Sequence, residues 1–162
     1  MQEPNENTDR RFVLEVIALA GEQVRQGRGG PFAAIVVRQG EVVARGANQV
    51  TSWNDPTAHA EVVAIREACR RLGDFQLAGC TVYASCEPCP MCLGAIYWAR
   101  PDRVVFAATR DDAAAAGFDD ALIYREIALP PADRAIRFDH VALPESAAPF
   151  DAWRASKGRI AY

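Results

Sequence analysis

Four side chains in two short motifs have the types and spacing of a metal site with an acid–base group beside it. His59 and Glu61 are two positions apart, and Cys89 and Cys92 are three apart. One histidine and two cysteines are zinc ligands, and a set of three leaves the fourth tetrahedral position open for water or hydroxide. Zinc lowers the pKa of bound water from 15.7 to about 7. We therefore expect His59, Cys89 and Cys92 to hold one catalytic Zn²⁺ while Glu61, not a ligand, transfers protons.

Both motifs lie where helices are expected to begin. Proline is tolerated in the first turn of a helix, which is the place that Pro90 would take between the two cysteines. Residues 55–57 (DPT) likewise precede an apolar-periodic run at 60–66. Two helix N-termini directed at one point would lower the thiol pKa values and favour thiolate ligands. The pairing of H-x-E with P-C-x-x-C is a signature of zinc nucleobase deaminases.

The cysteines also have other interpretations. Cys86 extends the second motif to C-x-x-C-x-x-C, but no fourth cysteine follows to complete an iron–sulfur site. His59 and all three thiols could instead form a closed, structural zinc site, or the chain could be a non-catalytic zinc-stabilised module that has no use for Glu61. A disulfide framework is disfavoured because five cysteines is an odd number.

Length and composition are those of an ordinary globular domain. The 162 residues, 50% hydrophobic and 24% charged, predict one domain over residues 1–162, with residues 1–8 frayed. The two motifs make this a zinc-dependent deaminase domain. A net charge of −3 and a pI near 5.4 argue against a polyanionic partner such as nucleic acid. No signal peptide or membrane-length apolar run is evident, so we expect no membrane partner and a cytoplasmic location.

The order of predicted elements indicates an α/β fold. Strand and helix alternate through both motifs, so the later strands should be parallel, with helices on both faces of the sheet. The ligands would then lie just beyond the carboxyl ends of strands, where open α/β sheets bind ligands. The expected elements are a helix capped by Thr8 or Asp9, a hairpin of 33–37 and 41–46, a helix from 59 to 72, a strand at 80–85, a helix from Pro90 to Arg100, a strand at 103–107, a short helix ending near 127, a strand at 136–141 and an amphipathic segment around 150–153.

Longer stretches resemble a known family. Residues 29–32 (GGPF), 54–61 (NDPTAHAE) and 85–100 (SCEPCPMCLGAIYWAR) are similar to the cytidine deaminase-like superfamily. Residues 116–120 (AGFDD) and the ending from Phe150 to Tyr162 resemble, more narrowly, the small bacterial guanine deaminases. The likeness runs from about Phe12 to the C-terminus. The zinc motif identifies the superfamily, and the last two segments carry the guanine assignment.

The resemblance implies a three-layer α/β/α sandwich around a mixed five-stranded sheet. It implies zinc-dependent hydrolysis of guanine to xanthine and ammonia in purine catabolism or salvage, with a small-molecule purine as substrate. It also implies a homodimer in which the C-terminal segment, about residues 145–162, is exchanged between subunits.

The resemblance further assigns roles around the base. Asn48 would hydrogen-bond the purine, Phe32 would pack against its ring, and Asp120 would contact the amino-group edge and assist proton transfer. Asn48 could instead satisfy loop backbone groups, Phe32 could belong to the core, and Asp120 could stabilise a helix N-terminus.

Three more residues complete the expected substrate site. Ala60 lies between His59 and Glu61, Trp98 follows helical spacing from the cysteines, and Tyr162 of one subunit would close the neighbour's pocket. Two departures from the family pattern are Ala33, which adds a methyl group where glycine is usual, and Trp53, which is larger than expected.

The nearest alternative function is that of a tRNA adenosine deaminase, which shares a similar D-P-T-A-H-A-E segment and cysteine motif. Such an enzyme binds flanking phosphates and needs basic residues near its pocket, whereas the last third of this chain is rich in acidic residues. Deamination of another amino-heterocycle, such as guanosine or ammeline, is a further alternative.

Overall fold

The computed structural model describes residues 6–161. The chain divides into two units, one ending at Ala121 and one beginning at Leu122, and each is described by itself. The first unit contains the sheet and both motifs. Its elements are α1 (Glu6–Arg25), β1 (Ala33–Arg38), β2 (Glu41–Ala47), α2 (Val50–Trp53), α3 (Ala60–Leu72), β3 (Cys80–Cys86), α4 (Pro90–Ala99), β4 (Arg103–Ala108) and α5 (Arg110–Ala115).

The sheet is mixed and has four strands in the order β2-β1-β3-β4. β1 pairs antiparallel with both β2 and β3, and β3 and β4 are parallel, as the βαβ pattern predicts. The expectation of five strands is wrong for the described residues, because the segment 136–141 forms no strand. A strand needs a neighbour to pair with, and no described residue of its own unit is in a strand.

The predicted hairpin is confirmed, with Gln39 and Gly40 as its two-residue turn. Both residues have positive φ, 53° and 81°, as a type I′ turn requires, and the glycine adopts this conformation without steric cost.

The register brings four chain segments to one edge of the sheet. Ala33 at the start of β1 lies opposite Ala47 at the end of β2. Ala34 pairs with Ala84 near the end of β3, and Cys86 pairs with Ala108 at the end of β4. The segments just outside this edge therefore contain Phe32, Asn48, the cysteine loop and Thr109.

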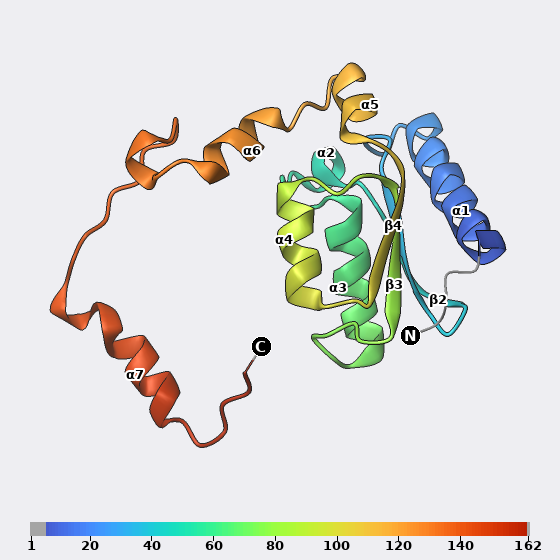
Figure 1. Ribbon diagram of the computed structural model, residues 1–162. Coiled ribbons are helices and arrows are strands. Elements are labelled where there is room, and N and C mark those ends of the chain that lie inside the picture. The colour runs from blue at the N-terminus through green and yellow to red at the C-terminus, as the bar shows by residue number, and fades with distance from the viewer. Residues whose placement is uncertain (1–5, 162) are drawn as a thin grey trace. The chain divides into compact units, whose positions relative to one another are not determined.

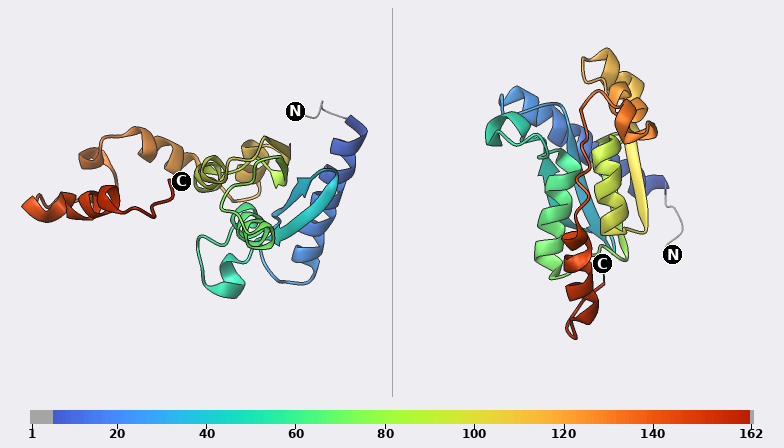
Figure 2. Two further views of the ribbon diagram at one scale, coloured as in Figure 1. Left: turned by 90° about the horizontal axis from the view of Figure 1, so that it is seen from below. Right: turned by 90° about the vertical axis from the view of Figure 1, so that its left-hand side faces the viewer.

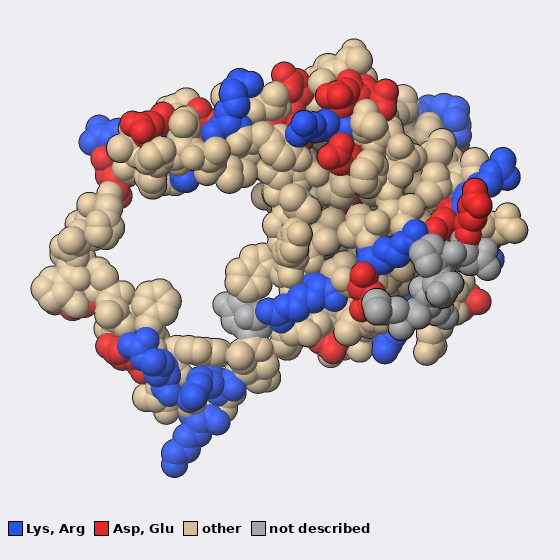
Figure 3. Space-filling model, in the orientation of Figure 1, with Lys and Arg blue, Asp and Glu red and all other residues tan. Residues whose placement is uncertain are grey.

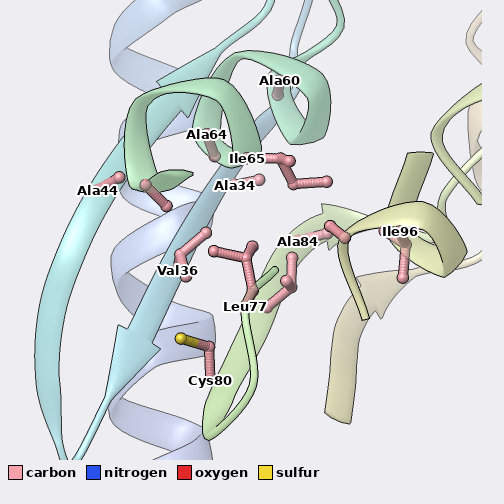
Figure 4. Packing of buried hydrophobic residues seen from close by; sticks show 13 residues of the cluster. Ala34, Val36, Ala44, Ala60, Ala64, Ile65, Leu77, Cys80, Ala84 and Ile96 are labelled. Atoms are coloured by element: carbon pink, nitrogen blue, oxygen red, sulfur yellow. The ribbon is translucent and has the colours of Figure 1, made fainter. Parts of the chain in front are cut away.

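Helices cover both faces of the sheet (Figure 1, with further views in Figure 2). α1 packs on one face through Phe12 and Val16, which join Ile35, Val37 and Tyr83 in one buried cluster. On the other face α3 and α4 bury a larger cluster with β1 and β3, which Figure 4 shows from close by. The three-layer arrangement of helices and sheet is thus present in the first unit.

Small residues let α3 lie close against β2. A methyl group on Gly46 would lie 2.2 Å from the Ala60 carbonyl oxygen and 2.5 Å from the Ala64 nitrogen. Ala60 and Ala64 are themselves fully buried. Gly46 therefore sets the distance between the sheet and the helix that begins with the His59 motif.

α1 begins before Thr8 and Asp9, so neither residue caps it, contrary to expectation. Asp9 instead ties the helix to two strands. Its Oδ1 accepts a hydrogen bond of 2.7 Å from the Tyr83 hydroxyl, and its two oxygens accept bonds of 2.9 and 2.7 Å from the Arg103 guanidinium. The hydrogen bonds from Arg103 keep the pKa of Asp9 below its usual value.

The second unit is helical, with α6 (Ala121–Ala128) leading into it, two 3-10 turns (Pro131–Asp133 and Pro144–Ala147) and α7 (Ala148–Ala155). The expected short helix and amphipathic segment correspond to α6 and α7. None of the described residues of this unit is buried, although many of them are large and apolar. Within residues 6–161 no helix has both the length and the apolar character needed to cross a membrane.

Candidate metal and active site

Both motifs lie at helix N-termini, as the sequence predicts. His59 is the N-cap residue of α3 and Cys89 is that of α4, where Pro90 takes the first helical position. Neither N-cap side chain bonds to its own helix backbone, so both are available to a ligand. Because Glu61 and Cys92 follow within the first turns, four functional side chains lie at the positive ends of two helix dipoles.

The three predicted ligands come together. His59 Nδ1 lies 3.5 Å from the Sγ atoms of both Cys89 and Cys92, and all three donor atoms lie within 4.8 Å of one another. Tetrahedral zinc with bonds of about 2.3 Å to sulfur and 2.0 Å to nitrogen separates those atoms by about 3.6 Å. The distances and the donor types therefore fit one zinc ion per chain.

Cys86 is not part of this group. It is buried, and its Sγ donates to the Thr109 carbonyl oxygen at 3.4 Å. Among the described residues, the group that could hold a metal consists of His59, Cys89 and Cys92. A closed site with four protein ligands is therefore not formed by these residues, and three ligands leave a coordination position for water.

Glu61 lies beside the ligands and is almost fully buried, with 8% of its surface exposed. Its Oε2 accepts a hydrogen bond of 3.4 Å from Cys92 Sγ. Loss of hydration raises the pKa of Glu61 above its usual value. A raised pKa makes the carboxylate a better proton acceptor than an ordinary glutamate, which suits a group that transfers protons.

The two thiols differ strongly in acidity. The hydrogen bond from Cys92, aided by the contact with His59, lowers the pKa of Cys89 to about 4. The pKa of Cys92 is raised because its proton is held by Cys89, and burial adds to the effect. Contact with Cys89 also raises the pKa of His59. The group thus already has one thiolate, which is the form that binds metal.

Asn48 follows β2 and is buried. Its Oδ1 accepts a hydrogen bond of 3.2 Å from the Val50 backbone N–H, so part of its amide satisfies a loop backbone group. Its own backbone N–H donates to the Phe32 carbonyl oxygen at 3.0 Å. The edge of the sheet thus places Asn48 and Phe32 side by side.

Phe32 has an aromatic neighbour that the sequence does not reveal. The Phe118 ring meets it edge to face, with 4.9 Å between centroids and 87° between ring planes. Asp120 lies two residues beyond Phe118 and is half-buried. Burial raises the pKa of Asp120, and the charge of Cys89 raises it further.

The remaining predicted residues occupy varied surroundings. Ala60 is fully buried in the first turn of α3, whereas Trp98 on α4 has 63% of its surface exposed. Trp53 is also exposed, and Ala33 is buried and donates its N–H to Ser85 Oγ at 3.0 Å. Tyr162 lies outside the described residues.

Comparison with known proteins agrees with this geometry. Residues 6–108 match the family described as the cytidine and deoxycytidylate deaminase zinc-binding region. A guanine deaminase of Bacillus subtilis is 57% identical over 143 residues, which are 88% of this chain and 92% of that protein. A tRNA-specific adenosine deaminase of Aquifex aeolicus is 39% identical, over 61% of this chain and 66% of its own length.

Structural similarity extends further along the chain. The X-ray structure of a guanine deaminase from Bacillus subtilis superimposes with a TM-score of 0.93 at 52% sequence identity, covering 100% of this chain and 99% of that one. The family match includes His59, Glu61, Cys89 and Cys92. The structural match continues beyond residue 108, through Asp120 and the second unit. The protein belongs to the cytidine and deoxycytidylate deaminase family, together with the guanine deaminase of Bacillus subtilis.

Proposed function

We propose that this protein is a guanine deaminase, which converts guanine and water into xanthine and ammonia. The observation that carries the proposal is the 57% identity to the Bacillus subtilis guanine deaminase over 92% of that protein. The tRNA deaminase relative covers only 61% of this chain. Figure 3 shows acidic and basic side chains interspersed over the visible face, with acidic ones gathered near α5, which does not favour a polyanionic substrate.

His59, Cys89 and Cys92 hold the zinc, which when bound lowers the pKa of water so that hydroxide is available at neutral pH. Glu61 takes one proton from the attacking water and delivers it to the ring nitrogen. It then transfers the proton of the newly added hydroxyl group to the amino group, which departs as ammonia while the carbonyl of xanthine forms. Its burial and its raised pKa support this role. A buried carboxylate beside the ligands, and not among them, is suited to transfer protons.

The purine lies among Asn48, Phe32 and Asp120 in this proposal. Asn48 hydrogen-bonds the base, Phe32 packs on its ring, and Phe118 supports Phe32 from the side. Asp120 contacts the amino-group edge and assists proton transfer. The shared sheet edge supports the first two assignments, and the influence of Cys89 on the Asp120 pKa supports the third. Ala60 and Trp98 complete the substrate-binding residues of this proposal.

In this proposal the second unit of one chain completes the active site of a second copy of the chain. Its helices bury none of their described residues, and they expose Leu122, Ile123, Phe150 and Trp153. A segment with so much exposed apolar surface requires another surface to cover it. A homodimer that exchanges this segment, and in which Tyr162 closes the partner's pocket, provides one. In such a dimer both units form one functional domain.

A reducing compartment suits the site. All five cysteines are free, and the ligand thiols must stay reduced to bind zinc. The cytoplasm keeps thiols reduced, so we place the protein there.

The test is ammonia release from guanine, run beside adenine, cytosine, cytidine, guanosine and ammeline, with xanthine identified by chromatography. Guanine should be consumed at least tenfold faster than each of the others. Zinc-loaded protein that is inactive on guanine would overturn the substrate assignment. In that case a tRNA anticodon loop is the next compound to be tested as a substrate.

A further inference from the structure

Gln23 is a buried polar residue on α1 that the proposed reaction does not use. It has 2% of its surface exposed and lies in the last two turns of the helix, between the half-buried Glu22 and the exposed Val24. A primary amide in such a place is costly unless it is hydrogen-bonded. Its hydrogen bonds therefore indicate what it does.

The Gln23 amide nitrogen joins two loops. Nε2 donates to the carbonyl oxygen of Asn48 at 3.1 Å and to that of Arg28 at 3.2 Å. The Arg28 N–H in turn donates to the Gln23 carbonyl oxygen at 3.1 Å. The Gln23 side chain thus connects the start of the 28–32 loop with Asn48, the residue that follows β2.

These contacts continue into the proposed base site. Asn48 is held on both sides of its backbone, since its carbonyl accepts from Gln23 and its N–H donates to Phe32 at 3.0 Å. Phe32 packs against Phe118. A methyl group on Gly29 would lie 2.3 Å from the Asn48 carbonyl oxygen, so the loop is tight against the same atom. The backbone of Asn48 has little freedom as long as Gln23 is present.

We infer that Gln23 is a positioning residue, which holds Asn48 and Phe32 in the arrangement that binds the purine. The inference rests on the proposed function. Gln23 acts through Asn48 and not on the reacting atoms, so it should influence substrate binding more than the chemical step. It is also remote in the chain from the zinc ligands and should leave metal binding intact.

The test is Gln23→Met in the full-length zinc-loaded protein, with Gln26→Met as the matched control. Methionine has a similar length but cannot donate to the two carbonyls. Gln26 is exposed, and its side-chain amide donates to the Glu22 carboxylate at the surface. We expect Gln23→Met to raise the KM for guanine about tenfold, with kcat within about threefold and zinc at one per chain. The control should match the wild type.

A double-mutant comparison separates positioning from a general structural effect. If Gln23 acts through Asn48, Gln23→Met should change KM less than about twofold in an Asn48→Ala background. Gln23→Glu keeps the length but offers at most one proton to two carbonyls. It should give an intermediate KM, and it replaces Gln23→Met if that variant does not fold.

Two results would overturn the inference. One is a KM for Gln23→Met equal to that of the control, and the other is an undiminished effect of Gln23→Met in the Asn48→Ala background. Failure of the proposed function is distinguishable, because the wild-type protein would then produce no xanthine from guanine.

Discussion

Glu61 is the residue on which the proposed chemistry depends most directly. Replacing it with glutamine keeps the size of the side chain but removes the group that exchanges protons. We expect Glu61→Gln to lower kcat by about 10²- to 10⁴-fold, while zinc, held by other residues, stays at one per chain. Steady-state kinetics and metal analysis of the same preparation measure both quantities.

Glu67 provides the control for this substitution. It lies on the same helix and pairs with Arg70 and Arg71 at the surface, where solvent screens such pairs and they contribute little to stability. Glu67→Gln should retain full activity. A Glu61→Gln variant that is as active as Glu67→Gln would remove Glu61 from the mechanism.

Residue types and spacing were enough to predict that His59, Cys89 and Cys92 come together as a zinc site, because zinc accepts few side chains and helices hold them at fixed intervals. The role of Glu61, which lies beside them, stays a prediction. Residue types and spacing were not enough for Phe118 or Gln23. A phenylalanine is usually a core residue and a glutamine usually an exposed one. Their importance here comes from contacts with residues distant in the chain, which no local pattern encodes.

At the scale of elements, the close approach of α3 to β2 positions the start of α3, where His59 lies. Gly46→Ala would place a methyl group 2.2 Å from the Ala60 carbonyl oxygen, so the N-terminus of α3 must move. We expect a loss of about 1–3 kcal/mol in unfolding free energy, together with weaker zinc binding because His59 moves with the helix. Denaturant unfolding and a competitive zinc titration provide the two measurements.

Gly94→Ala is the matched control, because a methyl group there meets no atom within 4 Å. Gly94 lies within α4, where alanine favours the helix by roughly 0.5–1 kcal/mol. The two substitutions should therefore change stability in opposite directions. Equal stability of the two variants would contradict the close approach of α3 to β2.

The Asp9 network predicts a pH dependence of stability. Because the pKa of Asp9 is lowered in the fold, the network stabilises the protein above the unfolded pKa near 3.8 and loses its effect as the pH falls through the lower folded pKa. Asp9→Asn should cost about 1–2 kcal/mol at pH 7, and the difference from the wild type should shrink below about pH 4. A difference that stays constant down to pH 3 would show that the Asp9 charge is not involved.

Elements with a local signal were predicted well, and so was the parallel pairing of β3 with β4, whereas the strand expected at 136–141 was not found. The hairpin turn at Gln39, the end of α3 at Gly73 and the start of α4 at Pro90 all follow from backbone preferences. The capping box from Thr109 to Asp112 that begins α5 depends equally on local residues. The strand expected at 136–141 is absent because apolar alternation alone cannot supply a pairing partner.

At the scale of the whole molecule, the exposed apolar helices of the second unit carry the proposal of exchange between subunits. Two inactive chains can test it. A Glu61→Gln chain retains its C-terminal segment, and a chain shortened by its last few residues, Tyr162 included, retains its zinc site. If the segment acts in the neighbouring subunit, mixing the two under conditions that exchange subunits should restore activity, since each mixed dimer contains one complete site.

Two results would contradict the exchange. The shortened chain could be fully active on its own, or the mixture could remain as inactive as its parts although mixed dimers form. Light scattering on the unmodified protein shows whether it is a dimer at all.

In the proposed reaction, hydrolysis of guanine requires one zinc ion held by His59, Cys89 and Cys92. The most direct measurement is xanthine production by protein stripped of metal with a chelator and then reloaded stepwise with zinc. Activity should vanish on removal, return in proportion to bound zinc, and stop rising at one zinc per chain. Undiminished activity without zinc, or no xanthine from fully loaded protein, would contradict the claim.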